Sequence, residues 1–229
     1  MTDFDVGIIG GGAVGLACAA KLAAAGRSVV LMERHSRPGQ ETSSRNSGVI
    51  HAGLYYPTGS LKAITCVEGR ELLYERCRKH GVGHKKTGKL LIATAADEEP
   101  KLEAIYARAM ANGAGGLTHI DRKEIARLEP RVTAVSGLWS PESGIVDVHE
   151  LMYSYQKEAA EHGALLVFQT EVLGIERAAH AFARDSKRWR RARDPGLRHR
   201  HQLCGAVCGP RCRAGRPRRG RPRLPLPLV

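Results

Sequence analysis

The sequence predicts an α/β fold, and three observations near its N-terminus support that prediction. An apolar run, Val6 to Ile9, leads directly into the glycine-rich stretch Gly10 to Gly15, which has the spacing G-x-G-x-x-G. An alanine-rich helical segment follows, and a second apolar run then ends at Glu33. Strand, glycine turn, helix, strand and acid in this order are typical of a Rossmann-type βαβ unit that binds a dinucleotide, FAD or NAD.

Each glycine of this turn has a physical role. Gly10 allows the tight turn, Gly12 lets the backbone approach a pyrophosphate, and Gly15 lets the helix pack on the strand. The helix N-terminus supplies unpaired N–H groups and the positive end of the helix dipole for the phosphates. Glu33 follows Gly15 by 18 positions, near the ~20 at which an acid accepts hydrogen bonds from a ribose; the alternative is a solvated charge at a strand end. The cofactor-binding residues expected in this unit are Gly10, Gly12, Ala13, Val14, Gly15, Glu33 and Arg34.

The other elements are predicted from hydrophobic spacing, in chain order. Strands at Phe4–Ile9 and Arg27–Met32 flank a helix at Ala13–Ala25, which Gly26 closes. The stretch Ser36–Ser60 is too long for an ordinary connection, and its Ser, Thr, Asn and Gly content is typical of a loop that wraps a ligand.

An amphipathic helix is expected next, at Leu61–His80. Its inward-facing residues are predicted to be Leu61, Ile64, Leu72, Leu73 and Cys77. A strand at Gly88–Thr94 and a helix at Ala96–Asn112 follow, and Asp121 and Glu124 have the spacing of a capping box that opens a short helix to Leu128. The last predicted elements are strands at Val135–Trp139 and Gly144–Val146, a helix at His149–His162, a strand at Ala164–Gln169 and the start of another at Glu171–Ile175.

This order of elements predicts a mixed α+β substrate domain inserted into the dinucleotide-binding domain. The dinucleotide-binding domain is expected to begin with residues 1–87, the inserted and incomplete substrate domain to span 88–147, and the chain to return to the first domain over 148–176. Residues 177–229 are rich in Arg, Pro and Gly and show neither alternation nor a helical face. Such a segment buries too little apolar surface to offset ordering costs of ~1–2 kcal/mol per residue, so a disordered basic tail is expected.

The formal net charge of +13 belongs to that tail. Residues 1–176 carry 20 Lys and Arg against 21 Asp and Glu, whereas residues 177–229 carry 16 against 2. The net charge of the whole chain is therefore no argument for a nucleic-acid-binding protein.

Cysteine spacing and the N-terminus bear on the compartment. The body cysteines, Cys18, Cys66 and Cys77, fit neither a disulfide framework nor a C-x-x-C metal site, so we expect reduced thiols and no metal there. The acidic N-terminus differs from a signal peptide, and the uncharged run Val6 to Ala20 is shorter than the ~20 residues of a membrane span. We expect a cytoplasmic protein, with peripheral membrane association through an electron acceptor left open.

The loop TSSRNSGVIHAGLYYPTGSLK, Thr42 to Lys62, identifies a family. With TGKLLIAT from Thr87, LEP at Leu128 to Pro130 and SPESGIVD from Ser140, it resembles the FAD-dependent L-2-hydroxyglutarate dehydrogenases and oxidases. These form a branch of the D-amino-acid-oxidase-like (DAO) superfamily, and the resemblance runs from Phe4 to about Glu176. It implies a noncovalent FAD, a substrate domain built on an antiparallel sheet, and oxidation of L-2-hydroxyglutarate to 2-oxoglutarate. Other DAO relatives, of the glycerol-3-phosphate dehydrogenase or amino-acid oxidase type, are the alternative.

The chemistry needs a base for the hydroxyl proton and cations for the carboxylates, while FAD takes the hydride. His51 is the candidate base because imidazole titrates near neutrality, although a histidine between Ile50 and Ala52 is often a hydrogen-bonded core residue. The candidates for binding the carboxylates are Arg45, Tyr56, Lys62 and Lys89. The loop residues expected at the pyrophosphate and flavin edge are Thr42, Ser43, Ser44, Arg45, Asn46 and Ser47. Oxygen, a quinone or another flavoprotein would reoxidise the flavin.

Beyond Glu176 the family pattern stops, and three hypotheses address the tail. A reading-frame shift is one: codons chosen for His199 to Gly209 spell, one base later, Ile-Val-Ile-Asn-Ser-Ala-Gly-Leu-Tyr-Ala, which looks like the family's next strand and turn. Arg219 to Pro222 (RGRP) resembles an AT-hook core, but no specific nucleic acid is expected as a partner. A metal site from His201, Cys204, Cys208 and Cys212 lacks the spacing of a zinc module. A chain truncated near Glu176 would leave the flavin site uncovered, and we expect it to be inactive.

Overall fold

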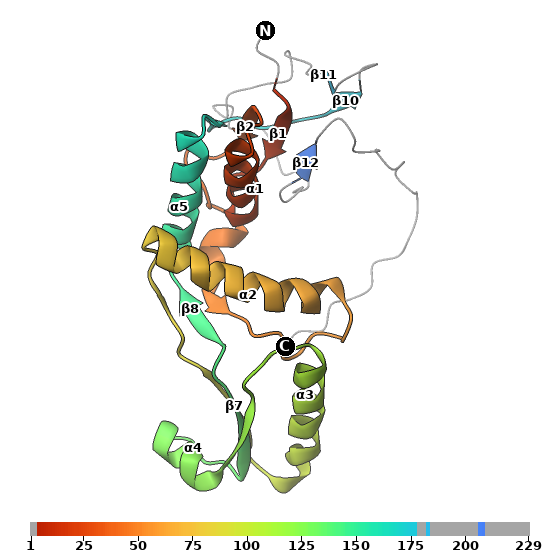
Figure 1. Ribbon diagram of the computed structural model, residues 1–229, viewed down its shortest axis with the longest axis vertical. Helices are drawn as coiled ribbons and strands as arrows, with labels where there is room; N and C mark the ends of the chain where they lie inside the picture. Colours follow the sequence, from red (N-terminus) through yellow and green to blue (C-terminus); the bar gives the residue numbers. More distant parts are fainter. Residues whose placement is uncertain (1–3, 178–181, 184–205, 209–229) are drawn as a thin grey trace, which may run out of the picture.

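The computed structural model describes residues 4–177, 182–183 and 206–208. They form two units joined through a long helix, α2 (Leu61–His80), which crosses between them (Figure 1). The first unit contains a sheet with strand order β12-β1-β2-β9. The second contains a three-stranded antiparallel sheet with the order β5-β7-β6.

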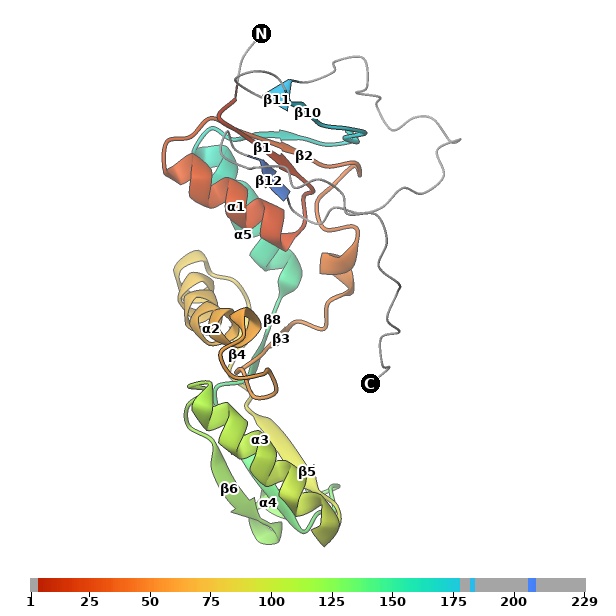
Figure 2. The same cartoon turned by 90° about the vertical axis from the view of Figure 1, so that its right-hand side faces the viewer.

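The first sheet is parallel where the glycine turn requires it. β1 (Val6–Ile9) pairs in parallel with β2 (Val29–Met32), and β2 pairs in parallel with β9 (Leu165–Val167). Helices α1 (Ala13–Ala24) and α5 (Val148–Glu161) lie side by side on one face of this sheet (Figure 2). The predicted βαβ unit and the later return of helix and strand are confirmed.

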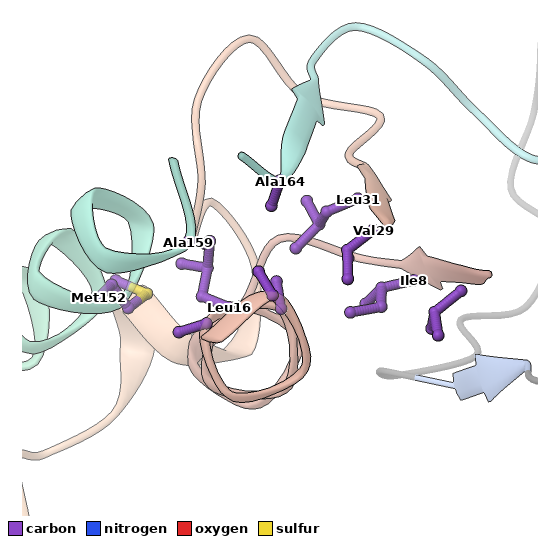
Figure 3. Packing of buried hydrophobic residues seen from close by; sticks show 11 residues of the cluster. Ile8, Leu16, Val29, Leu31, Met152, Ala159 and Ala164 are labelled. Atoms are coloured by element: carbon purple, nitrogen blue, oxygen red, sulfur yellow. The ribbon is translucent and has the colours of Figure 1, made fainter. Parts of the chain in front are cut away.

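The core of the first unit lies between this sheet and the two helices. Ile8, Val29 and Leu31 point from the strands toward Leu16 on α1, and Met152 and Ala159 close the cluster from α5 (Figure 3). Small residues on α1, including Ala19, Ala20 and Ala23, are buried where α1 packs. The alanine-rich composition of α1 therefore serves close packing between the helix, its partner helix and the sheet.

The second unit has its own core under one helix. Strands β5 (Lys89–Ala93), β6 (Thr118–Asp121) and β7 (Ser136–Ser140) carry α3 (Glu99–Ala111), which follows a short 3-10 turn, η2 (Ala96–Glu98). The sequence did not indicate β6, which ends at the N-cap of α4 (Arg122–Leu128). Asp121 caps α4 by accepting from the Glu124 N–H at 2.8 Å, but the Glu124 carboxylate pairs with Arg127 and does not return to the cap.

Small strands connect the two units. β8 (Gly144–Val146) pairs antiparallel with β3 (Val49–Ile50) and with β4 (His84–Lys85), neither of which the sequence indicated. The chain enters the second unit at Gly88 and returns at Ser143, and the Gly88 N–H donates to the Ser143 carbonyl at 3.0 Å. Entry and exit of the second unit are therefore adjacent.

The prediction for α2 is correct in extent, and of the residues expected to face inward it is right for Cys77 and Leu73 and wrong for the other three. Ser60 caps its start and Gly81, at φ 67°, ends it. Leu61, Ile64 and Leu72 are exposed, with Leu72 at 65%. The buried residues of this helix are Ala63, Arg70, Tyr74 and Cys77, with Leu73 partly buried. Arg70 and Tyr74 can be buried because their polar ends bond to the carbonyls of Ala114 and Glu142.

The contrast between a buried leucine of β7 and an exposed leucine of α2 gives a stability prediction. Leu138→Ala, at a fully buried position of β7, should lower the free energy of unfolding by about 2–5 kcal/mol, because it removes apolar contacts and leaves a cavity. Leu72→Ala is the matched control and should change it by no more than about 0.5 kcal/mol. Urea unfolding followed by circular dichroism measures both, and equal losses would contradict the burial described.

The C-terminal part differs from the sequence prediction in two places. Glu171–Ile175 is not a strand, and the next strand is β10 (Glu176–Arg177), which pairs with β11 (Phe182–Ala183). Within the tail expected to be disordered, β12 (Ala206–Cys208) pairs antiparallel with β1. The RGRP segment and the residues His201, Cys204 and Cys212 lie outside the described residues. No helix in the described part of the chain is long and apolar enough to cross a membrane.

Candidate active site

The glycine turn between β1 and α1 has the close contacts expected of a dinucleotide site. Gly10 has φ 101°, and its N–H donates to the Met32 carbonyl at 2.8 Å, which ties the turn to β2. A Cβ atom on Gly15 would lie 2.0 Å from the Gly10 carbonyl oxygen. Only glycine can therefore occupy position 15 while the turn keeps this shape.

Glu33 lies at the carboxyl end of β2 with its side chain aimed at the turn. It is 7% exposed, and its carboxylate accepts from the Gly11 N–H at 2.6 Å and from the His35 N–H at 2.8 Å. A carboxylate has about four acceptor positions, so two remain for a ligand. Glu33 thus stands at the carboxyl end of β2, as the sequence predicts, and its role toward a ribose stays a prediction.

Ser43 links the predicted binding loop to the start of α1. Residues Thr42–Arg45 form a short 3-10 helix, η1. The Ser43 hydroxyl accepts from the Ala13 N–H at 3.1 Å, and a Cβ on Gly12 would lie 3.0 Å from the same oxygen. Loop and helix start thus form one wall, although they are separated by thirty positions in the sequence.

A cavity of about 450 Å³ lies against this wall. Its lining includes the glycine turn, the end of β2, the start of η1 and the segment Thr170–Ile175. Among the predicted residues, those that line it are Gly10, Gly12, Val14, Gly15, Glu33, Arg34, Thr42 and Ser43, whereas Ala13, Ser44, Arg45, Asn46 and Ser47 are not part of the lining. Volumes of about 300–1,000 Å³ are usual for ligand sites.

The segment Thr170–Ile175 is the part of this lining that sequence reasoning missed. The Thr170 N–H donates to the Glu33 carbonyl at 2.9 Å, which fixes the segment beside the carboxyl end of β2. One available signal was its place directly after a strand predicted to join a parallel sheet. Ligands bind at the carboxyl ends of such strands.

Charged side chains close one side of the cavity. Glu41 pairs with Arg34 and lies 2.7 Å from the His35 Nε2 atom. These two partners, His35 first, lower the pKa of the Glu41 carboxyl below its ordinary value. Arg34 is therefore held at the cavity wall by Glu41.

A second cluster forms around His51, which directly follows β3. Lys62 from α2 and Lys89 from β5 lie close enough to act on the imidazole electrostatically. The Lys62 Nζ lies 4.5 Å from the centroid of the Tyr56 ring, and the Lys89 Nζ lies 4.7 Å from that of Tyr55. The structure thus brings together four predicted residues that are up to 38 positions apart, His51, Tyr56, Lys62 and Lys89.

The surroundings of His51 favour its neutral form. Partial burial lowers the pKa of the imidazole, and the positive charges of Lys89 and Lys62 lower it further. Burial also raises the pKa of the Tyr56 hydroxyl, which therefore stays a hydrogen-bond donor. Arg45 does not join this cluster: its side chain is exposed at the end of η1 and has no hydrogen bond or ion pair with another described residue.

Comparisons with known proteins agree with this geometry. The model of the family "DAO: FAD dependent oxidoreductase" matches residues 5–201, past the point near Glu176 where the motifs end. The L-2-hydroxyglutarate dehydrogenase of Arabidopsis thaliana is 48% identical over 150 residues, which are 66% of this chain and 31% of that protein. The Homo sapiens dehydrogenase of the same name is 37% identical over 80% of this chain and 40% of its own length. Both relatives are named mitochondrial. The chain spans about two fifths or less of each.

Solved structures show the same fold. The L-alpha-glycerophosphate oxidase of Mycoplasma pneumoniae, with FAD bound, superposes with a TM-score of 0.74 at 30% identity, over 78% of this chain and 48% of that one. Glycine oxidase from Geobacillus kaustophilus superposes with a TM-score of 0.67 at 26% identity, over 76% and 48%.

FAD fits the residues present. The Gly15 contact leaves the turn free of side chains, a buried carboxylate stands at the end of β2, and the cavity continues along both. FAD is accordingly the cofactor of this fold. Because the matched residues 5–201 make up most of the sequence, the chain belongs to the DAO family of FAD-dependent oxidoreductases.

Proposed function

We propose that this chain oxidises a 2-hydroxy acid, L-2-hydroxyglutarate, to 2-oxoglutarate. The observation that carries the proposal is the cluster in which Lys62 and Lys89 lie close enough to His51 to act on its imidazole electrostatically. A base beside two cations suits a substrate that loses a hydroxyl proton and carries two carboxylates. The relatives named L-2-hydroxyglutarate dehydrogenase support the same substrate.

Each residue has a proposed role. Bound FAD supplies the acceptor for the hydride that leaves C2. An imidazole nitrogen of His51 takes the hydroxyl proton, so that the C–O bond becomes a carbonyl. Lys62 and Lys89 hold the carboxylates, and Tyr56 donates a hydrogen bond. Arg45 lies outside this cluster on η1, and its proposed role is to reach a carboxylate of the bound substrate from there.

The cofactor is proposed to lie along the glycine turn. Backbone N–H groups at Gly12 and Val14 face the pyrophosphate at the start of α1. Ala13 lies between them and ties Ser43 to the same site through its own N–H. Glu33 accepts from the ribose, Arg34 lines the same wall, and the residues of the loop that approach the pyrophosphate and flavin edge are Thr42, Ser43, Ser44, Arg45, Asn46 and Ser47. We further propose oxygen, a quinone or a flavoprotein as the electron acceptor, and a cytoplasmic location in keeping with the free thiols of Cys18, Cys66 and Cys77.

Flavin reduction tests this function. The purified chain, loaded with FAD under anaerobic conditions, should lose its visible flavin absorbance on addition of L-2-hydroxyglutarate and keep it with the D-enantiomer. This result would also overturn the expectation that the chain is inactive. Bleaching by glycerol 3-phosphate or an amino acid, but not by L-2-hydroxyglutarate, would instead favour the reactions suggested by the names of the structural neighbours. Flavin that stays oxidised with every substrate would contradict the proposal.

A further inference from the structure

The backbone of the loop His51–Tyr56 is held by side chains from α2 and from α3 of the second unit. From α2, the Cys66 Sγ donates to the His51 carbonyl at 3.3 Å, and the Arg70 Nη1 donates to the Ala52 carbonyl at 3.4 Å. From α3, the Arg108 Nη1 donates to the Tyr55 carbonyl at 3.5 Å. Asn112, at the C-cap of the same helix, makes two shorter hydrogen bonds to the loop.

Asn112 lies at the C-cap of α3 and bridges the end of this loop. Its Nδ2 donates to the Gly53 carbonyl at 3.0 Å and to the Tyr56 carbonyl at 2.9 Å. The amide has two hydrogens, and both are used. Its Oδ1 is buried and has no hydrogen-bond partner among the described residues.

The unpartnered oxygen shows what fixes the amide orientation. A flipped side chain would set the Oδ1 against two carbonyl oxygens, which cannot donate to it. The loop carbonyls therefore determine how Asn112 is oriented, at the cost of a buried acceptor left unpaired. A contact retained at such a cost points to a requirement for the loop's shape.

We propose that Asn112 is a positioning residue for the site around His51. It holds the turn from Gly53 to Tyr56, which carries both tyrosine rings that lie under the ammonium groups of Lys62 and Lys89. The amide thereby couples α3 of the second unit to the loop that bears the base. The inference rests on the proposed function, since it assigns Asn112 to the base and cations of that reaction.

The ionisation of His51 provides a readout of this positioning. The groups that face the imidazole are Lys62 from α2 and Lys89 from β5, and the thiol of Cys66 bonds to the histidine's own carbonyl. The His51 residue is already exposed in part, so a loosened loop would act mainly by moving the imidazole away from both ammonium groups. The loss of these neighbouring positive charges raises the pKa of His51 toward its ordinary value.

The test compares Asn112→Ala with Gln156→Ala by NMR titration of His51 in the full chain. Gln156 lies on α5 and its side chain has no hydrogen bond to another described residue, so this control removes an amide without touching the loop. We expect the pKa of His51 to rise in Asn112→Ala and to stay unchanged in Gln156→Ala. An unchanged pKa in folded Asn112→Ala would overturn the proposal.

A measurement on the unaltered protein covers the case in which Asn112→Ala does not fold. Both side-chain amide protons of Asn112 should exchange with solvent more slowly than those of the exposed residue Gln169, whose side chain has no hydrogen bond to another described residue. Equal exchange rates would show that the bridge does not form in solution, and the proposal would be wrong.

Flavin reduction separates this inference from the proposed function. If the unaltered chain reduces its flavin with L-2-hydroxyglutarate, Asn112→Ala should slow that step roughly tenfold or more at saturating substrate, because a small displacement of a reacting group is costly. FAD affinity should not change. If the unaltered chain reduces no flavin, the proposed function fails, while the titration still decides whether Asn112 positions His51.

Discussion

Gly15→Ala is expected to abolish FAD binding. The added Cβ would lie 2.0 Å from the Gly10 carbonyl oxygen and 3.2 Å from its carbon, both of which are backbone atoms that cannot rotate away. The turn must open, and this displaces the N–H groups of α1 and the Ser43 contact at Ala13. We expect no flavin to remain with the purified variant, measured as visible absorbance per protein after dialysis.

Gly69→Ala is the matched control for this substitution. Gly69 lies within α2, and a Cβ there would meet no atom within 4 Å. Alanine should stabilise the helix by about 0.5–1 kcal/mol and leave flavin content unchanged. A Gly15→Ala protein that keeps normal flavin content would show that the cofactor does not lie on this turn.

His51→Gln is expected to have the largest effect on the chemical step. Glutamine keeps a polar side chain but cannot take the hydroxyl proton, and loss of a general base costs roughly 10²–10⁴-fold in rate. Anaerobic stopped-flow measurement of flavin reduction by L-2-hydroxyglutarate gives this rate directly. His162→Gln, at the exposed C-cap of α5, should react normally. A normal rate in His51→Gln would exclude proton abstraction by this residue.

The same base determines the pH dependence of the unaltered protein. His51 acts only when neutral, so the rate should fall as pH is lowered through its pKa. Burial and the two lysines place this pKa below the ordinary value of about 6.5. The rate should therefore be level at neutral pH and fall only in more acidic solution, and the fall should disappear in His51→Gln.

The elements that the sequence predicted well are those governed by neighbouring residues. The glycine turn and Glu33 follow from spacing within one βαβ unit, and the bounds of α2 follow from Ser60 and Gly81 at its ends. The buried face of α2 could not be predicted from hydrophobicity, because Arg70 and Tyr74 are buried through bonds to distant carbonyls. Hydrophobic spacing therefore predicted an inward position for Leu72, which is exposed.

The site was predictable as a set of residues and not as a geometry. His51, Tyr56 and Lys62 belong to one motif, but only the pairing of β5 with β7 and the packing of the second unit bring Lys89 near them. Asn112 carried no signal, because its two bonds join positions more than fifty residues apart. The lining segment Thr170–Ile175 depended on where β9 joins the sheet.

The hydrogen bond between Gly88 and Ser143 has a consequence for how such proteins diversify. The segment from β5 to β7 begins after Gly88 and ends before Ser143, and these two residues are in contact. A short turn could bridge these two residues, and another inserted domain could replace the segment between them without altering the glycine turn. New substrate preferences could therefore arise by recombination at this one junction while the dinucleotide site is inherited intact.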